Sequence, residues 1–227
     1  MAENRPLLIL RLEGAMQSWG ESSKWDIRNT AIMPTKSGVI GLLACALGLP
    51  RGDERINALY GALRVAVRAD LQGSRMVDYH TVTGEPLRNA EGKPRSTGNT
   101  FISHREYWQD ASFLVVIEAE YGLLEQLKQA LLHPKWCLYL GRKSCVPSRP
   151  VFETLTYAYI SSLDAIQRYP AAPRAQYPML YECENASPQA AVLTRPDGKP
   201  AAGTRRFVRR QVWRSTVKEE VHVSDEN

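Results

Sequence analysis

Three aliphatic segments, separated by stretches of helical character, restrict most strongly what this chain can fold into. They cover residues 6–13, 64–71 and 111–120, and each is short enough to be a buried strand. Helices are predicted at 35–47, 53–63 and 123–132, and a further short strand at 136–140. The order strand, helices, strand, strand, helix, strand is that of a ferredoxin-like, or RRM-like, α+β sandwich. We therefore expect such a domain over about residues 1–150.

A polar segment interrupts the second half of this expected domain. Residues 83–105 are rich in Gly, Pro, Asn, Ser and Thr, and their basic side chains outnumber the acidic ones. An insertion of this length without structure of its own is uncommon in a compact domain unless it has a function or is disordered. Residues 75–83 are predicted to be extended, and we expect the insertion to project as an arm or hairpin. Short β-like pieces predict a small β-rich region over 151–227.

The composition is that of a soluble globular protein with local basic patches. The chain has 227 residues, of which 44% are hydrophobic and 23% charged, and its formal net charge is +5. Its four cysteines form no CxxC pair, so neither a zinc site nor another cofactor is expected. The apolar run near the N-terminus is too short for a signal peptide or a membrane span, which predicts a cytoplasmic protein without membrane contact.

Two basic, glycine-containing segments have the character of phosphate sites. The first is MPTKSGVIGLLACALGLP, residues 33–50. Here Thr35 or Ser37 can cap a helix whose first turn offers free backbone N–H groups to an anion, with Lys36 beside them. The alternative is an ordinary helix cap with a solvated lysine.

The second basic segment is YLGRKSCVPSRP, residues 139–150. It contains Arg142, Lys143, Ser144 and Arg149, is bounded by prolines, and includes no carboxylate to neutralise its cations. A solvated loop is the alternative, but the pattern favours contact with a phosphate backbone.

Flat side chains lie close to these loops. Gln17 and Trp19 follow the first strand, Trp25 and Arg28 lie in the next loop, and Tyr139 precedes the basic loop. Single-stranded RNA held in a bend needs cations for its phosphates and flat side chains for its unstacked bases. These loops can converge on one edge of the sheet. For the two tryptophans, packing in the core or against a partner is an equally good hypothesis.

Four segments together carry a resemblance to a known family. They are LRLEGAMQSWG, PTKSGVIGLLACALG, the DYHTV segment at 78–82, and REYWQDASFLVV followed by YLGRKSC. Their order resembles the fifth family of CRISPR-associated repeat-associated mysterious proteins (RAMPs), in the form that serves type I-E Cascade. The similarity covers most of residues 6–150, and the remainder agrees only in general character.

The resemblance implies a non-catalytic RNA-binding subunit that caps one end of a backbone filament and holds the 5′ handle of CRISPR RNA. Its partners would be CRISPR RNA, the backbone RAMP subunits and the large subunit of Cascade, with target DNA reached through the complex. Residues 83–105 would form a thumb against the neighbouring backbone subunit. The candidate RNA-binding residues are Gln17, Trp19, Arg28, Lys36, Ser37, Arg105, Tyr139, Arg142, Lys143 and Ser144.

An enzymatic alternative comes from the type I-C branch, in which a fifth-family RAMP is a metal-independent endoribonuclease. Such cleavage needs a base, an acid and a cation around one phosphate. His80 and His104 are the candidates, but a histidine in such a chain is more often structural, and no adjacent lysine–histidine pair accompanies them. We therefore expect no catalytic residues.

A third hypothesis is an RRM-like RNA-binding protein unconnected with CRISPR. It is weakened because the predicted strand DASFLVVIEAE carries one aromatic residue and lacks the aromatic-rich RRM signature. The densest basic run lies elsewhere, at 205–214, where we expect a solvated edge strand protected by charge, with a surface for an acidic partner or target DNA as the alternative.

Overall fold

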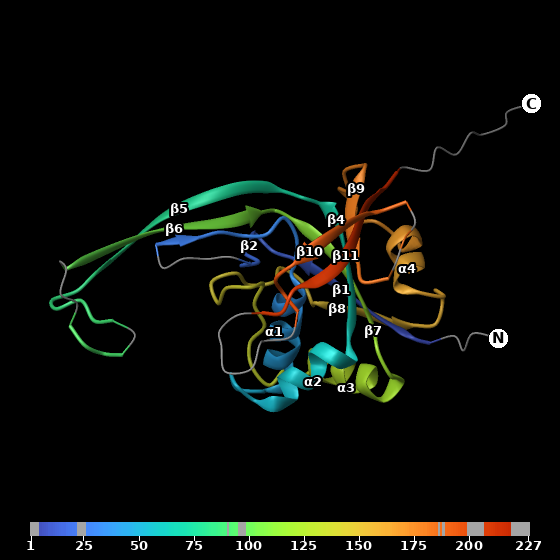
Figure 1. Cartoon of the computed structure of the whole chain (residues 1–227), viewed down its shortest axis with the longest axis horizontal. Helices are drawn as coiled ribbons and strands as arrows, with labels where there is room; N and C mark the ends of the chain where they lie inside the picture. The colour runs from blue at the N-terminus through green and yellow to red at the C-terminus, as the bar shows by residue number, and fades with distance from the viewer. Residues whose placement is uncertain are drawn as a thin grey trace, which may run out of the picture.

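The protein has an α+β architecture built on one large antiparallel sheet, with a long hairpin projecting from it (Figure 1). The computed structural model describes residues 5–21, 26–89, 91–94, 99–185, 187, 189–198 and 207–218. In spatial order the sheet contains β10 (Ala191–Arg195), β11 (Arg210–Val217), β9 (Met179–Cys183), β4 (Arg64–Leu71), β7 (Ser112–Glu118), β1 (Leu7–Glu13) and β8 (Phe152–Thr156).

The predicted RRM-like core is confirmed by the strand order β4-β7-β1-β8. Helices α1 (Lys36–Leu47) and α2 (Glu54–Ala62) connect β1 to β4, and α3 (Tyr121–Leu132) leads from β7 towards β8. The strand predicted at 136–140 is wrong, because β8 occupies the fourth position. Residues 136–145 instead form a loop, whose Leu140 is fully buried and bonds through its backbone to Ser18 and Cys145.

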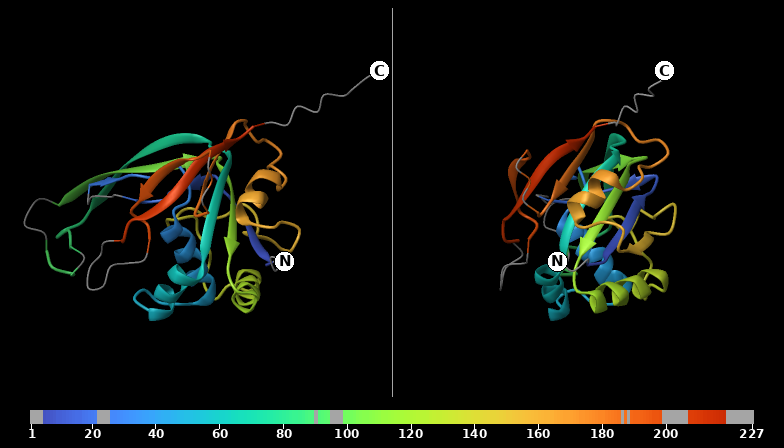
Figure 2. Two further views of the ribbon diagram at one scale, coloured as in Figure 1. Left: turned by 45° about the vertical axis from the view of Figure 1, so that its right-hand side comes forward. Right: turned by 90° about the vertical axis from the view of Figure 1, so that its right-hand side faces the viewer.

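Successive side chains along the central strands point to opposite faces of the sheet, and each face carries a hydrophobic core. On β1, Leu8, Leu10 and Leu12 pack with the layer formed by α1, α2 and α3. Leu7 and Ile9 face the opposite layer, where α4 (Ser162–Arg168) lies (Figure 2). Because both faces are covered, the strands read as continuous aliphatic runs in the sequence.

Local signals set the bounds of α1. The Thr35 hydroxyl accepts a hydrogen bond from the Gly38 N–H at 3.1 Å, and Gly48 ends the helix with a φ of 70°. These are the N-cap and C-cap geometries that the sequence predicts. In the part of the chain that the structure describes, no helix is both long and apolar enough to cross a bilayer.

The projecting arm is a hairpin of two strands of ten residues, β5 (Ser74–Thr83) and β6 (Thr100–Gln109). Two short strands, β2 (Met16–Gln17) and β3 (Ile27–Arg28), pair with β6 and tie the arm to the body. The predicted hairpin is therefore present, but it is longer than the insertion at 83–105. It includes β5 and the whole of β6.

The C-terminal strands join the same sheet through β9, which pairs with β4. Ion pairs reinforce this join, since Glu182 contacts both Arg195 and Arg214, and Arg210 lies 2.7 Å from Asp197. The expectation that the basic run at 205–214 forms an edge strand is wrong, because β11 lies between β10 and β9; Arg205 and Arg206 fall outside the described residues. A division of the chain at residue 150 stays a prediction.

A buried charged cluster fixes α4 and the loop after it on the sheet. The Asp70 carboxylate, which is fully buried, receives hydrogen bonds from Arg11 and from Arg68, whose Nε lies 2.6 Å away. Arg68 also donates to the carbonyl oxygens of Ile166 and Tyr169, and the Ala172 N–H donates to Asp70 at 2.8 Å. Helix α4 and the loop after it are thus held on the sheet by charged side chains and backbone groups that all lose their contact with water on folding.

Candidate nucleic-acid interface

Two of the sequence-predicted contact residues, Gln17 and Trp19, belong to the core. The Gln17 amide donates to the carbonyl oxygens of Leu12 at 3.0 Å and Ala111 at 2.8 Å, and accepts from the Trp19 indole at 3.2 Å. Trp19 is 1% exposed and packs so closely on Gly38 that a Cβ there would lie 2.7 Å from the ring. Core packing is therefore the role of Trp19 in this structure. Trp25 lies outside the described residues.

Lys36 also turns inward, although the anion site predicted at its helix is present. The Lys36 backbone N–H donates to the Asp197 carboxylate at 2.7 Å. Its ammonium lies 2.7 Å from the Leu63 carbonyl oxygen and 3.0 Å from Glu184. The anion at the N-terminus of α1 is thus a carboxylate of the chain itself. Ser37 lies beside this site, with its hydroxyl 3.2 Å from that of Thr35.

The remaining basic candidates meet where the arm joins the body. Arg28 on β3 lies opposite Arg105 on β6 in the strand register. Arg142, from the loop after α3, donates to the Arg28 carbonyl oxygen at 2.8 Å and stacks its guanidinium 4.5 Å from the centre of the Tyr107 ring. Within the described residues, none of these three arginines forms an ion pair, although Asp78 lies opposite Arg105 in the strand register and the Arg142 charge acts on the Glu106 carboxyl. The junction is therefore rich in positive charge without a direct ion pair.

A tight turn fixes the loop that carries Arg142. Gly141 has a φ of 84°, and a Cβ at this position would lie 1.8 Å from the Ser18 carbonyl oxygen. The loop is closed by a hydrogen bond of 2.8 Å from the Cys145 N–H to the Arg142 carbonyl oxygen. Burial raises the pKa of the Cys145 thiol, which therefore stays protonated and packs as a small apolar group.

The other residues of this loop differ in their exposure to solvent and in whether they already form an ion pair. Lys143 and Ser144 are exposed, and Tyr139 is half-buried beside them. Arg149 is already compensated, because it lies 3.7 Å from Glu13 and 2.8 Å from Glu153. Lys143 is therefore the exposed cation of the loop that has no ion pair among the described residues, and it follows Arg142 in the chain.

Sequence comparison places this geometry in a known family. The family model described as CRISPR-associated protein (Cas_Cas5) matches residues 7–221. The chain belongs to this family. The CRISPR system Cascade subunit CasD of Escherichia coli strain K12 is 37% identical to it over 160 residues, which cover 65% of this chain and 70% of CasD.

Solved structures agree with this assignment to the family. A chain of a CRISPR RNA-guided surveillance complex superposes with a TM-score of 0.72 and 29% identity, covering 93% of this chain and 90% of that chain. A structure described as a Cas protein superposes with a TM-score of 0.69 and 34% identity, covering 94% and 96% of the two chains. The resemblance found in the sequence segments is thereby confirmed.

The two histidines considered as catalytic candidates, His80 and His104, do not share a site. Tyr79 pairs with His104 across β5 and β6, and the two rings stand edge to face with centroids 5.4 Å apart. His80, the next residue on β5, therefore points to the opposite face, where its Nδ1 lies 3.5 Å from Asp78. Among the described residues, no group of three or more His, Cys, Asp or Glu side chains is placed to hold a metal ion.

Sequence reasoning missed Tyr107, the ring on which Arg142 stacks. The signal was present, because Arg105 and Tyr107 stand two residues apart in REYWQD and so share one face of a strand. This signal depends on β6 being a strand along its whole length, which its mixed polar and apolar sequence does not indicate. Glu106, on the other face, is engaged by Arg75 at 2.6 Å, and this hydrogen bond lowers the pKa of its carboxyl.

Proposed function

We propose that this family member is a non-catalytic, RNA-binding subunit of a type I-E Cascade complex, which holds the 5′ handle of CRISPR RNA and caps the backbone filament. Its partners are then CRISPR RNA, the backbone subunits and the large subunit, and it reaches target DNA through the complex. The observation that carries the proposal is the cluster of Arg28, Arg105 and Arg142, none of which forms an ion pair with a described residue, in a chain similar to a Cascade subunit. The proposed compartment is the cytoplasm, where the free cysteines stay reduced.

In the proposed interface, the arginines of the arm junction hold phosphates, and the loop after α3 continues the path. A guanidinium presents a planar set of donors that matches phosphate oxygens, and stacking on Tyr107 holds Arg142 in place before RNA arrives. Lys143, Ser144 and Tyr139 extend this surface. The proposed interface does not depend on Gln17, Trp19, Lys36 or Ser37, whose side chains are engaged inside the protein or beside the α1 cap.

The absence of catalysis is proposed from the placement of the histidines. In-line cleavage requires a base and an acid on either side of one phosphate. His80 and His104 lie on opposite faces of the hairpin and cannot serve the same phosphate. The type I-C activity therefore has no support from this geometry.

Removing two cations of the interface, one half-buried and one exposed, tests the proposed RNA contact. Arg105→Ala combined with Lys143→Ala should weaken binding of single-stranded repeat RNA. The slope of log affinity against log salt should fall by about 1.4, at about 0.7 for each lost phosphate contact. We would measure this by fluorescence anisotropy at several salt concentrations.

The matched control removes two cations that are already paired. Lys128 contacts Glu125 at 3.1 Å on α3, and Arg168 contacts Asp164 at 3.2 Å on α4. Lys128→Ala with Arg168→Ala changes the net charge by the same amount but should leave the slope as in the unmodified protein. Equal slopes in the two double variants would contradict the proposed interface.

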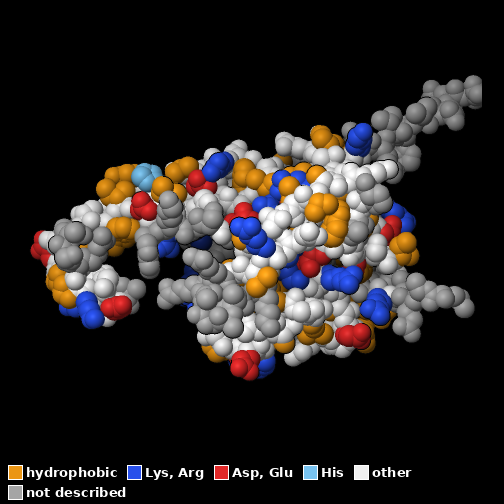
Figure 3. All heavy atoms as spheres, in the orientation of Figure 1, with side chains coloured by type: hydrophobic (Ala, Val, Ile, Leu, Met, Phe, Trp, Pro, Cys, Tyr) orange, Lys and Arg blue, Asp and Glu red, His pale blue; other side chains and the backbone are white. Residues whose placement is uncertain are grey.

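The arm is proposed to dock on the neighbouring backbone subunit. Val77, Tyr79 and Ile102 share one face of the hairpin and are 56%, 61% and 41% exposed, with Ile27 beside them at 49%. Figure 3 shows hydrophobic side chains on the outer side of the arm. Such an exposed apolar patch is typical of a surface that a partner covers.

Replacing apolar by polar side chains that are also branched at Cβ tests the docking. Val77→Thr with Ile102→Thr keeps the β-branched character of the strands, so folding should change little. Docking on the backbone subunit should lose roughly 1 kcal/mol for each residue, as measured by co-purification and by titration of the two subunits. Val192→Thr, on the exposed strand β10, is the control and should assemble normally. Unaltered assembly of the double variant would refute the role of this face.

A further inference from the structure

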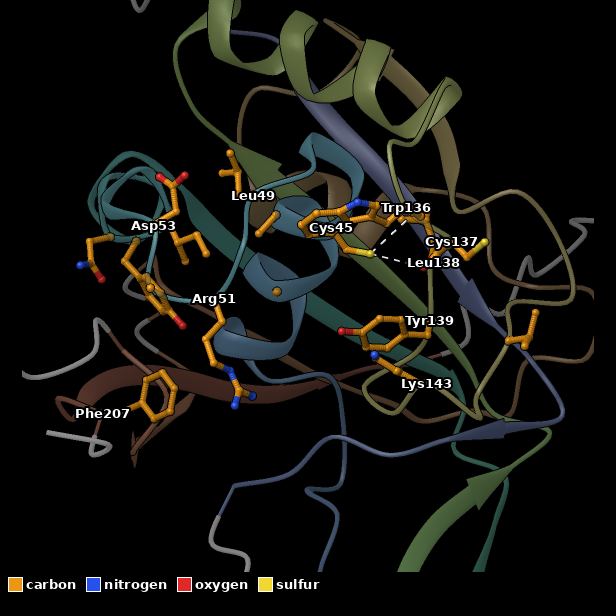
Figure 4. Close-up of a pocket in the computed structure, with 17 residues that line it drawn as sticks. Cys45, Leu49, Arg51, Asp53, Trp136, Cys137, Leu138, Tyr139, Lys143 and Phe207 are labelled. Atoms are coloured by element: carbon orange, nitrogen blue, oxygen red, sulfur yellow. Dashed lines mark hydrogen bonds between the residues drawn. The ribbon is translucent and has the colours of Figure 1, made fainter. Parts of the chain in front are cut away.

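An open pocket adjoins the proposed RNA path and has no role in the function proposed above. It lies between α1, α2, the loop after α3 and the segment at Phe207, and its volume is about 1120 Å³ (Figure 4). Pockets of about 300–1,000 Å³ are enough to bury most of an organic ligand. The pocket can therefore take at least one flat group together with its charged substituent.

Aromatic rings stand on two sides of this pocket. On one side Phe207 lies 6.3 Å from Tyr60, measured between ring centroids. On the other side are Trp136 and Tyr139, which Figure 4 shows across the hollow from Phe207. Trp136 is 47% exposed and Phe207 is 39% exposed, so large apolar rings remain open to solvent. Rings placed in this way form stacking platforms for a flat ligand.

The charges around the pocket favour an anion. Arg51 and Lys143 are exposed lining residues, and neither forms an ion pair within the described part of the chain. Asp53 is the one carboxylate among the described lining residues, and its oxygens are held by Arg55, with the closest nitrogen 2.6 Å away. Burial raises the pKa of the Cys45 thiol, and the positive charge of Lys143, another lining residue, opposes this shift.

We propose that this pocket receives one nucleotide of the bound RNA, with its base against the aromatic walls and its phosphate on Lys143 and Arg51. The inference rests on the proposed RNA-binding function and extends it to a specific subsite. Tyr139 and Lys143 belong to the same loop as Arg142, so a strand that leaves the arm junction reaches the pocket along a continuous surface. Single-stranded RNA is recognised in this manner, through splayed bases on aromatic side chains.

The test removes bases from the RNA one at a time while keeping its phosphates. The full chain is titrated with single-stranded CRISPR repeat RNA and with a series in which each RNA carries one abasic ribose. One position should bind about 5- to 150-fold more weakly, the range that corresponds to losing one stacked base. Trp136→Ala or Tyr139→Ala should cause a loss of the same size, whereas Tyr139→Phe should retain the affinity.

Combining the two kinds of change identifies the site. The abasic RNA should bind the Trp136→Ala variant about as well as it binds the unmodified protein, because the same contact is lost only once. Tyr121→Ala is the control, since Tyr121 is 53% exposed on α3 and does not line the pocket. Its affinity for the unmodified RNA should not change.

The outcomes separate this inference from the proposed function. Suppose that the unmodified protein binds repeat RNA and that Arg105→Ala weakens this binding. If no abasic position then changes the affinity, the subsite is refuted and the proposed function stands. Failure of the unmodified protein to bind the RNA would overturn both. If the pocket variants bind RNA normally but lose the large Cascade subunit, the occupant is a protein segment, and the nucleotide assignment is wrong. The abasic series uses the unmodified protein, so a misfolded variant does not obstruct the test.

Discussion

Asp70→Asn is expected to lower the free energy of unfolding by about 3–5 kcal/mol, the cost of removing one partner of a buried ion pair. Asp70 and Arg68 are fully buried, and Arg11 is 3% exposed. Without the carboxylate, two guanidinium groups remain in the interior with only carbonyl oxygens and, for Arg11, the more distant Glu153 to receive their hydrogens. Urea unfolding followed by circular dichroism measures the change.

The control for this variant removes a carboxylate from an exposed ion pair. Glu91 lies 3.4 Å from Lys93 near the tip of the arm, and both side chains are more than 70% exposed. Glu91→Gln should change the free energy of unfolding by less than about 1 kcal/mol. If Asp70→Asn proved equally mild, the cluster would not be what holds α4 and its loop on the sheet.

Gly141→Ala is expected to destabilise the protein by at least about 2 kcal/mol and to weaken RNA binding at the same time. The left-handed backbone contributes about 1–3 kcal/mol of strain for a residue with a side chain, and overpacking against Ser18 adds a similar amount. Relief of this contact requires the loop to move away from Ser18, which displaces Arg142 and Lys143. Thermal unfolding and RNA titration measure the two effects on one preparation.

A glycine in open space provides the comparison. A Cβ at Gly61, in α2, would meet no atom within 4 Å. Gly61→Ala should therefore leave stability unchanged or raise it by up to about 1 kcal/mol, and should not affect RNA binding. A Gly141→Ala variant that behaved like Gly61→Ala would show that the loop is not fixed by its contact with Ser18.

The elements that the sequence predicted well are those decided by local patterns. β1, β4 and β7 are aliphatic because both faces of the sheet are covered, and α1 is bounded by Thr35 and Gly48. β6 was missed in part, because a hairpin exposed on its outer face mixes polar and apolar residues and its conformation depends on pairing with β5. The apolar run 136–140 was mistaken for a strand because its side chains enter the core and the pocket from a loop.

The candidate site was predictable in composition but not in detail. The basic loop and Arg105 could be selected from the sequence, because cations without neighbouring carboxylates stand out. The sequence does not show which of these cations are neutralised by residues far away in the chain. Lys36 meets Glu184 across 148 positions of the chain, and no local pattern links the two. The burial of Gln17 and Trp19 likewise depends on contacts made by Ala111 and Gly38.

The contact between α1 and Asp197 has a consequence for the order of events during synthesis. The Lys36 N–H and the carboxylate that it binds are 161 positions apart. A growing chain therefore completes β1, α1 and β4 long before the acidic groups that occupy the start of α1 have been translated. Until then, the Lys36 ammonium can reach the Leu63 carbonyl oxygen, but the N–H at the start of the helix lacks its carboxylate. The last strands therefore do more than widen the sheet, because their arrival supplies the charge that completes the first helix.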